Sequence, residues 1–130
     1  MEIPQILRTF KTVAVVGASR NPQKDSHQIF LYLLRHGFEA CPVNPNADEI
    51  AGHKCYKSLN GLPKKPEMVD IFRPSAEVMP IVDEAIKVGA KAIWMQLGVI
   101  NEEAAQKARK AGLEVIMNHC IAMENEKLKK

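Results

Sequence analysis

The segment from Gly17 to Ser26 contains residue types and spacing suited to binding an anion. It follows Thr12–Val16, an apolar run rich in β-branched residues and typical of a strand buried on both faces. A helical pattern of apolar residues begins at Ile29, and Ser26 before it is a good N-cap candidate. A strand, a small-residue turn and a helix in this order bring backbone N–H groups and a helix dipole to one point. That arrangement favours a phosphate group.

A structural role for this turn is the alternative. Gly17 is its only glycine, so the segment is not the GxGxxG fingerprint of dinucleotide-binding proteins. Any connection from a strand to a helix can use glycine and serine for the turn and the cap without binding a ligand. The spacing by itself leaves both interpretations open.

The rest of the chain predicts an α/β fold with a doubly wound parallel sheet of about five strands and helices on both faces. Asn101 is expected to cap the helix that follows it, and residues 47–68 are expected to be irregular. Strand pairing is expected to lapse near Pro42, which cannot donate a ladder hydrogen bond. The expected strands are 12–16, 38–43, 69–72, 91–97 and 113–117.

Ligands of such sheets bind beyond the carboxyl ends of the strands, at the point where the strand order reverses. Polar and small residues follow every predicted strand. In chain order they are Gly17, Ala18, Ser19 and Arg20; Asn44, Pro45 and Asn46; Arg73, Pro74 and Ser75; Gln96 and Gly98; and Asn118, His119 and Cys120.

The end of the second strand argues against a nicotinamide cofactor. An NAD-dependent enzyme normally has Asp or Glu there to hold the ribose hydroxyls, whereas this chain has Asn44-Pro45-Asn46. An NAD(P)-binding oxidoreductase is therefore the weakest alternative.

Five blocks of sequence occur in a fixed order along residues 11–124, nearly the whole chain. They are Val16-Gly17-Ala18-Ser19 with Pro22, Lys24 and Ser26; Pro42-Val43-Asn44-Pro45; Phe72-Arg73-Pro74; Trp94-Met95-Gln96-Leu97-Gly98; and Cys120 with Glu124. Together they resemble the small CoA-binding protein family, which is similar to the N-terminal domain of the succinyl-CoA synthetase α subunit.

The resemblance implies a Rossmann-like fold that binds coenzyme A, or an acyl-CoA, at the carboxyl edge of the sheet. Arg20, Lys24 and Arg73 would offset part of the phosphate charge. By position in the family pattern, the diphosphate would be lined by Gly17, Ser19 and Arg20, with Ala18, Lys24 and Ser26 nearby. The adenosine would be flanked by Val43, Asn44 and Pro45. A further wall would be formed by Phe72, Arg73 and Pro74, and the pantetheine arm would be bordered by Gln96 to Gly98.

The chain departs from the family pattern before its last cysteine, where Asn118-His119 stands instead of an acidic or polar residue followed by Arg. The synthetase's second domain, with its phosphorylated histidine, is also absent. The resemblance therefore implies CoA binding without independent catalysis.

A thiol-based role of Cys120 is the alternative. It could form a mixed disulfide with CoA or take part in an acyl transfer. His119 would assist only if the two side chains turned together, and adjacent strand residues point to opposite faces.

Composition is that of an ordinary soluble protein, with 130 residues and a formal net charge of +3. We expect a single cytoplasmic domain, residues 1–130, without a signal peptide or membrane span. The spread lysines and few aromatic residues argue against nucleic-acid binding. A homodimer is a further possibility, because the first and last helices have apolar faces.

Several remaining residues are expected to have structural roles. The three cysteines lack CxxC spacing, and no histidine has metal-ligand spacing, so no metal site is predicted. His27 is expected at the surface or a helix end, Asp70 in a local pair and Trp94 in the core. Cys41 is expected in the core and Cys55 in an exposed position.

Overall fold

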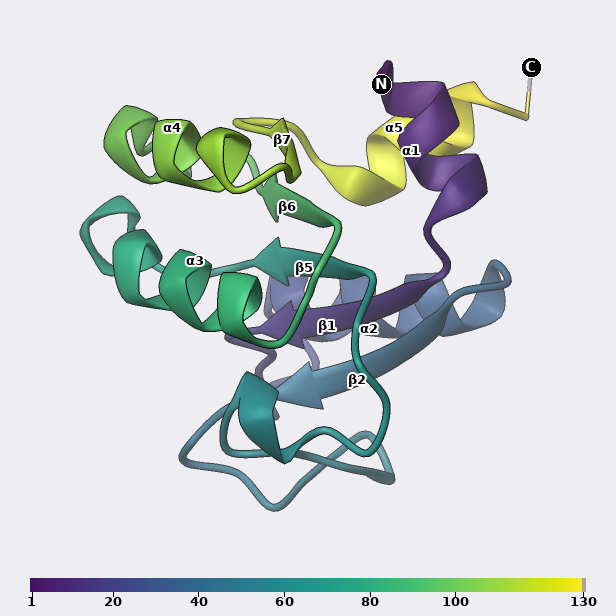
Figure 1. Ribbon diagram of the computed structural model, residues 1–130. Coiled ribbons are helices and arrows are strands. Elements are labelled where there is room, and N and C mark those ends of the chain that lie inside the picture. Colours follow the sequence, from purple (N-terminus) through teal and green to yellow (C-terminus); the bar gives the residue numbers. More distant parts are fainter. Residues whose placement is uncertain (130) are drawn as a thin grey trace.

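The computed structural model describes residues 1–129 and has a five-stranded sheet at its centre, in the order β2-β1-β5-β6-β7 (Figure 1). Every pairing between neighbouring strands of this sheet is parallel. The predicted Rossmann-like α/β fold is therefore confirmed. The strands are β1 (Thr12–Val16), β2 (Glu39–Val43), β5 (Met68–Ile71), β6 (Ala92–Met95) and β7 (Glu114–Ile116).

Helices cover both faces of the sheet, with α3 and α4 on one face and α1, α2 and α5 on the other (Figure 1). Trp94 is fully buried in the core that α1, α2 and α5 share, as predicted. No helix within residues 1–129 has the length and apolar composition needed to span a bilayer. The helices are α1 (Ile3–Thr9), α2 (Asp25–Arg35), α3 (Val78–Lys87), α4 (Glu102–Lys110) and α5 (Ile121–Lys127), with short 3-10 turns η1 (Leu59–Gly61) and η2 (Ser75–Glu77).

Two expectations, one about the second strand and one about the segment 47–68 that follows it, are wrong. Pairing of β2 with β1 continues through Pro42 to Val43. This is possible because β2 is the edge strand, so Pro42 has no outer β-strand neighbour to which it must donate. The segment 47–68 also contains an antiparallel hairpin of β3 (Glu49–Ile50) and β4 (His53–Lys54), which the sequence pattern did not reveal.

The start of α2 differs from the prediction as well. The helix begins at Asp25 with Lys24 as its N-cap residue, so the prediction of Ser26 as the N-cap is wrong. Ser26 lies inside the first turn and is buried. The turn from Asn21 to Lys24, closed by a backbone hydrogen bond of 3.0 Å, starts the helix before Ser26 is reached.

The strand order reverses between β1 and β5. From β1 the chain moves to β2 on one side and then returns to β5 on the other side of β1. At the carboxyl end of this pair, Gly17 has a φ of +90°, and a Cβ there would lie 2.6 Å from the carbonyl oxygen of Phe72. Only glycine fits this crossing point, because both the backbone conformation and the space exclude a side chain.

Candidate functional site

The loop after β1 is fixed by side chains from three segments. Asn44 donates from Nδ2 to the carbonyl of Ala18 at 2.9 Å, and Asn21 N–H donates to Ser19 Oγ at 3.0 Å. His27 Nδ1 lies 2.7 Å from the carbonyl oxygen of Ser19. His27 belongs to the first turn of α2, a helix end as predicted, but it is buried and not on the surface. Its ring holds the loop against the helix.

This loop and the first turn of α2 present unused hydrogen-bond donors. Among residues 1–129, the backbone N–H groups of Ser19, Arg20, Asp25 and Ser26 donate to no protein acceptor. Asp25 and Ser26 form the start, and so the positive end, of an 11-residue helix, and Ser19 and Arg20 belong to the loop before it. Free N–H groups at a helix N-terminus favour an anion such as a phosphate group.

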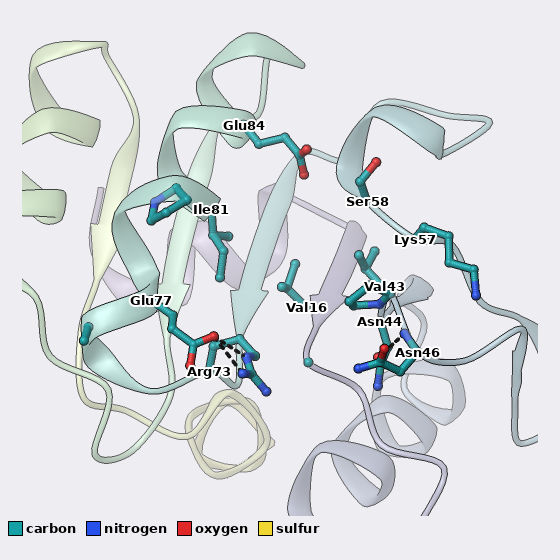
Figure 2. Close-up of a pocket in the computed structure, with 14 residues that line it drawn as sticks. Val16, Val43, Asn44, Asn46, Lys57, Ser58, Arg73, Glu77, Ile81 and Glu84 are labelled. Atoms are coloured by element: carbon teal, nitrogen blue, oxygen red, sulfur yellow. Dashed lines mark hydrogen bonds and ion pairs between the residues drawn. The ribbon is translucent and has the colours of Figure 1, made fainter.

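One cavity, of about 580 Å³, lies on the α3 side of this loop (Figure 2). Its middle is apolar, with Val16, Val43 and Ile81 facing the space. Ser58 and Glu84 stand at one end, and Arg73 and Glu77 at the other (Figure 2). We call it the first cavity; it is lined by Val16, Gly17, Val43, Asn44, Pro45, Asn46, Lys57, Ser58, Arg73, Ala76, Glu77, Pro80, Ile81 and Glu84.

Charged groups around the first cavity are paired with protein partners. Arg73 donates to Glu77 Oε1 from Nε at 3.2 Å and from Nη2 at 2.7 Å (Figure 2). Lys57 Nζ lies 2.8 Å from Asp48, and its hydrogen bond lowers the pKa of that carboxyl group. Glu84 accepts from the Leu59 N–H at 2.8 Å. An incoming phosphate must therefore compete with Glu77 for Arg73.

A second cavity, of about 340 Å³, lies on the α2 and α5 side of the switch point. Gln96 is buried, and its Oε1 accepts from the Ile121 N–H at the start of α5 at 3.0 Å. Cys120 is a free, half-buried thiol beside it. This second cavity is lined by Asp25, Gln28, Ile29, Phe72, Gln96, Leu97, Cys120 and Met123.

The exit of β5 divides the two cavities. Phe72 and Arg73 are consecutive residues, yet Phe72 lines the second cavity and Arg73 lines the first. The loop with the unused N–H groups leaves β1 next to this point. An extended ligand could therefore place a different part in each cavity and an anionic group between them.

The fold brings most of the predicted residues to these cavities. The first contains Gly17, Val43, Asn44, Pro45 and Arg73, and the second contains Phe72, Gln96 and Cys120. Ser19, Arg20, Lys24 and Ser26 belong to the loop with the unused N–H groups and to the start of α2, and Ala18 is buried. Pro74 and Gly98 line neither cavity.

Gly98 is held by the neighbouring loops. Its N–H donates to Asn118 Oδ1 at 2.8 Å, and its carbonyl accepts from Ser75 at 3.4 Å. Asn118 adopts a left-handed conformation with a φ of +64°. The structure therefore gives Gly98 a role in joining the ends of β6 and β7, and its N–H is not free for a ligand.

Several lining residues were missed by the sequence analysis. The 47–68 segment supplies Lys57 and Ser58, and α3 supplies Ile81 and Glu84. No sequence signal marks the first pair, because they follow a hairpin too short to give a periodic pattern. Met123 was equally unmarked. Leu97, which belongs to the block from Trp94 to Gly98, also lines the second cavity, and these apolar side chains are 60% (Leu97) and 58% (Met123) exposed.

The fold is Rossmann-like, with two cavities at the carboxyl edge of the sheet that the exit of β5 separates. The chain belongs to the CoA binding domain family, whose family model matches residues 11–126. The resemblance proposed from the sequence is therefore confirmed.

Among sequence relatives, the uncharacterized protein YneT of Bacillus subtilis is 38% identical over 120 residues, which cover 92% of this chain and 89% of YneT. The ADP-forming acetate–CoA ligase II of Archaeoglobus fulgidus is 34% identical over 125 residues, covering 92% of this chain but 19% of the ligase. The chain thus corresponds to about a fifth of that enzyme.

Solved structures likewise include one chain of similar length and one much longer enzyme. A hypothetical protein from Pyrococcus horikoshii has a TM-score of 0.95 at 43% identity, covering 98% of this chain and 90% of its own. The apo dinucleotide-forming acetyl-coenzyme A synthetase 1 of Ca. Korarchaeum cryptofilum has a TM-score of 0.75 at 32% identity, covering 86% of this chain and 27% of its own.

Proposed function

We propose that this chain binds coenzyme A in an extended form across the two cavities. The adenosine part occupies the first cavity, the diphosphate lies on the loop from Ser19 to Ser26, and the pantetheine arm enters the second cavity. In this proposal residues 1–130 act as one CoA-binding domain. The observation that carries it is the pair of cavities on either side of a loop whose backbone N–H groups are unused.

The first cavity has the surface that an adenine ring requires. A flat aromatic base needs apolar walls, which Val16, Val43 and Ile81 supply, and polar groups at its edge. Ser58 and Glu84 stand at one end of this apolar middle (Figure 2). At the other end Arg73 lies toward the loop that would hold the diphosphate.

Positive charge near the loop complements the ligand. CoA carries several phosphate charges, and Arg20 and Lys24 are exposed on the loop. The N–H groups of Ser19 in the loop and of Ser26 at the helix N-terminus add uncharged donors. Similarity to acetate–CoA ligases, whose names state their use of CoA, supports the same ligand.

Binding of NAD has less support. The side chain of Asn44 is occupied on both atoms, because Nδ2 donates to Ala18 and Oδ1 accepts from the Asn46 N–H at 2.8 Å. Asn44 therefore offers a ribose diol neither a carboxylate nor a free amide.

Isothermal titration calorimetry with CoA tests the proposal. We expect saturable binding at one site and no comparable heat with NAD. Arg20→Ala and Lys24→Ala should each weaken CoA binding while thermal unfolding stays close to that of the wild type, since both side chains lie in an exposed loop.

Arg109→Ala and Lys110→Ala are matched controls, because they remove the same charges at the exposed end of α4. Their affinity for CoA should equal that of the wild type. Equal affinities in all four variants would mean that the phosphates bind elsewhere. Absence of CoA binding by the wild-type protein would refute the proposal.

A further inference from the structure

The second cavity combines a thiol with an unused hydrogen-bond donor. Cys120 and Gln96 both line it, and they come from the chain segments that follow β7 and β6. A thiol beside an amide N–H is the pair of groups that an acyl transfer needs, because one attacks a carbonyl carbon and the other stabilises the carbonyl oxygen.

The orientation of the Gln96 amide follows from its hydrogen bond. The backbone N–H of Ile121 requires an acceptor, so Oε1 faces α5. The NH₂ group of the same side chain must then point away from that N–H. Among residues 1–129 Nε2 has no acceptor, although only 4% of Gln96 is exposed. Nε2 keeps some exposure, and an unpaired donor on a side chain that lines a cavity can donate to a ligand oxygen there.

The walls of the second cavity indicate what that ligand carries. Ile29, Phe72, Leu97 and Met123 are apolar, and the single charged residue among those lining the cavity is Asp25. A carboxylate on the ligand would be repelled by Asp25 and would find no lysine or arginine. The cavity therefore favours an uncharged, apolar group, and its volume of about 340 Å³, which the pantetheine arm would share, favours a short chain.

The other two cysteines are poor candidates for the same chemistry. Cys55 is buried, not exposed as its loop position predicted, and its Sγ lies 3.7 Å from the carbonyl oxygen of Asn44. Cys41, expected in the core, is half-buried in β2. Burial raises the pKa of both thiols, which lowers the fraction present as the nucleophilic thiolate. Neither residue lines either cavity.

We propose that Cys120 accepts a short apolar acyl group from an acyl-CoA whose thioester lies beside Gln96. This inference rests on the proposed CoA binding. The Cys120 sulfur forms a bond to the carbonyl carbon, the bond from that carbon to the CoA sulfur breaks, and the thiol proton ends on the released CoA. The exchange converts one thioester into another, so no oxidant, reductant or co-reactant is needed. Gln96 Nε2 donates to the carbonyl oxygen as negative charge develops there.

The test is intact-mass spectrometry of the protein incubated with excess propionyl-CoA and denatured in acid. We expect a mass increase of one propionyl group, located by peptide mapping at Cys120, removed by hydroxylamine and stable to a disulfide reductant. Malonyl-CoA has the same number of acyl carbons as propionyl-CoA but a carboxylate in place of the terminal methyl group. It should therefore label Cys120 more slowly.

Three variants separate the roles of the residues. Cys120→Ala should abolish labelling, while Cys41→Ala should label at the wild-type rate. Gln96→Glu keeps the acceptor for the Ile121 N–H and removes the amide donor, so labelling should slow by about 10²-fold. Circular dichroism of each variant checks that the fold is retained.

The inference is refuted if CoA binds in calorimetry while no propionyl group is transferred, and the proposed function then stands. It is equally refuted if Cys120 gains the mass of a whole CoA through a reducible disulfide, or if Gln96→Glu labels at the wild-type rate. A protein that binds no CoA refutes the proposed function as well, and calorimetry detects that separately.

Discussion

Asp70 lies in the middle of β5 with no partner for its charge. Its strand neighbours are Val15 and Trp94, and its side chain is fully buried. Neither carboxyl oxygen has a hydrogen-bond partner among the residues that the structure describes, so the expected local pair of Asp70 is wrong. Desolvation raises the pKa of Asp70 well above its usual value, because burial penalises the ionised form. We therefore predict that this carboxyl group makes the protein less stable as the pH rises.

The direction of this change in stability with pH follows from proton linkage. Between the unfolded-state pKa of about 3.9 and the higher folded-state pKa, the folded protein holds a proton on Asp70 that the unfolded chain has released. The free energy of unfolding therefore falls as the pH rises through this window. One carboxyl group contributes a slope of at most about 1.4 kcal/mol per pH unit. Below the window its contribution is constant, and above the folded-state pKa the loss is complete.

Asp70→Asn removes the titration with little change in shape, and Asp70→Val also removes the unpaired polar group. We expect the stability difference between Asp70→Asn and the wild type to grow in favour of the variant from pH 4 upward. Asp70→Val should be more stable than the wild type by about 1–3 kcal/mol even at low pH, the cost of a buried polar group without a partner. Urea denaturation followed by circular dichroism, repeated from pH 4 to pH 8, measures both.

Asp48→Asn is the control, because Asp48 is exposed and Lys57 lowers its pKa. Asp48→Asn should leave the pH dependence between pH 4 and pH 8 unchanged, because any stability that this pair contributes is lost only as the pH falls through the lowered folded-state pKa of Asp48, below this range. Parallel stability curves for the wild type and Asp70→Asn across this pH range would refute the argument for Asp70.

Two further predictions concern the switch point. Gly17→Ala should destabilise the fold, by at least the 1–2 kcal/mol of a left-handed alanine, because its Cβ would lie 2.6 Å from the Phe72 carbonyl; an unchanged urea midpoint would contradict this. Glu77→Gln should tighten CoA binding by up to about fivefold, because the carboxylate that holds Arg73 at 2.7 Å is removed. Calorimetry measures that affinity, and an equal or weaker affinity would show that Arg73 does not reach the phosphates.

The sequence by itself determined the elements whose pattern is local. Thr12–Val16 is a strand with the predicted bounds, because a continuous run of β-branched residues suits a position covered on both faces. Asn101 caps α4 as predicted, with its Oδ1 accepting from the Ala104 N–H at 3.0 Å. The parallel order followed from the alternation of strands and helices, and the carboxyl edge of the sheet followed from that order.

Tertiary structure decided which side chains line the same cavity. Ser58 and Ile81 line one cavity although a strand and two 3-10 turns separate them in the chain, and Phe72 and Arg73 are neighbours that line different cavities. Asp70 and Cys55 were misjudged for the same reason. Periodicity reports which face of its own element a residue occupies, but burial and partners depend on what the other elements place against that face. The crossover between β2 and β5 determines which elements pack against one another, and no local sequence pattern encodes it.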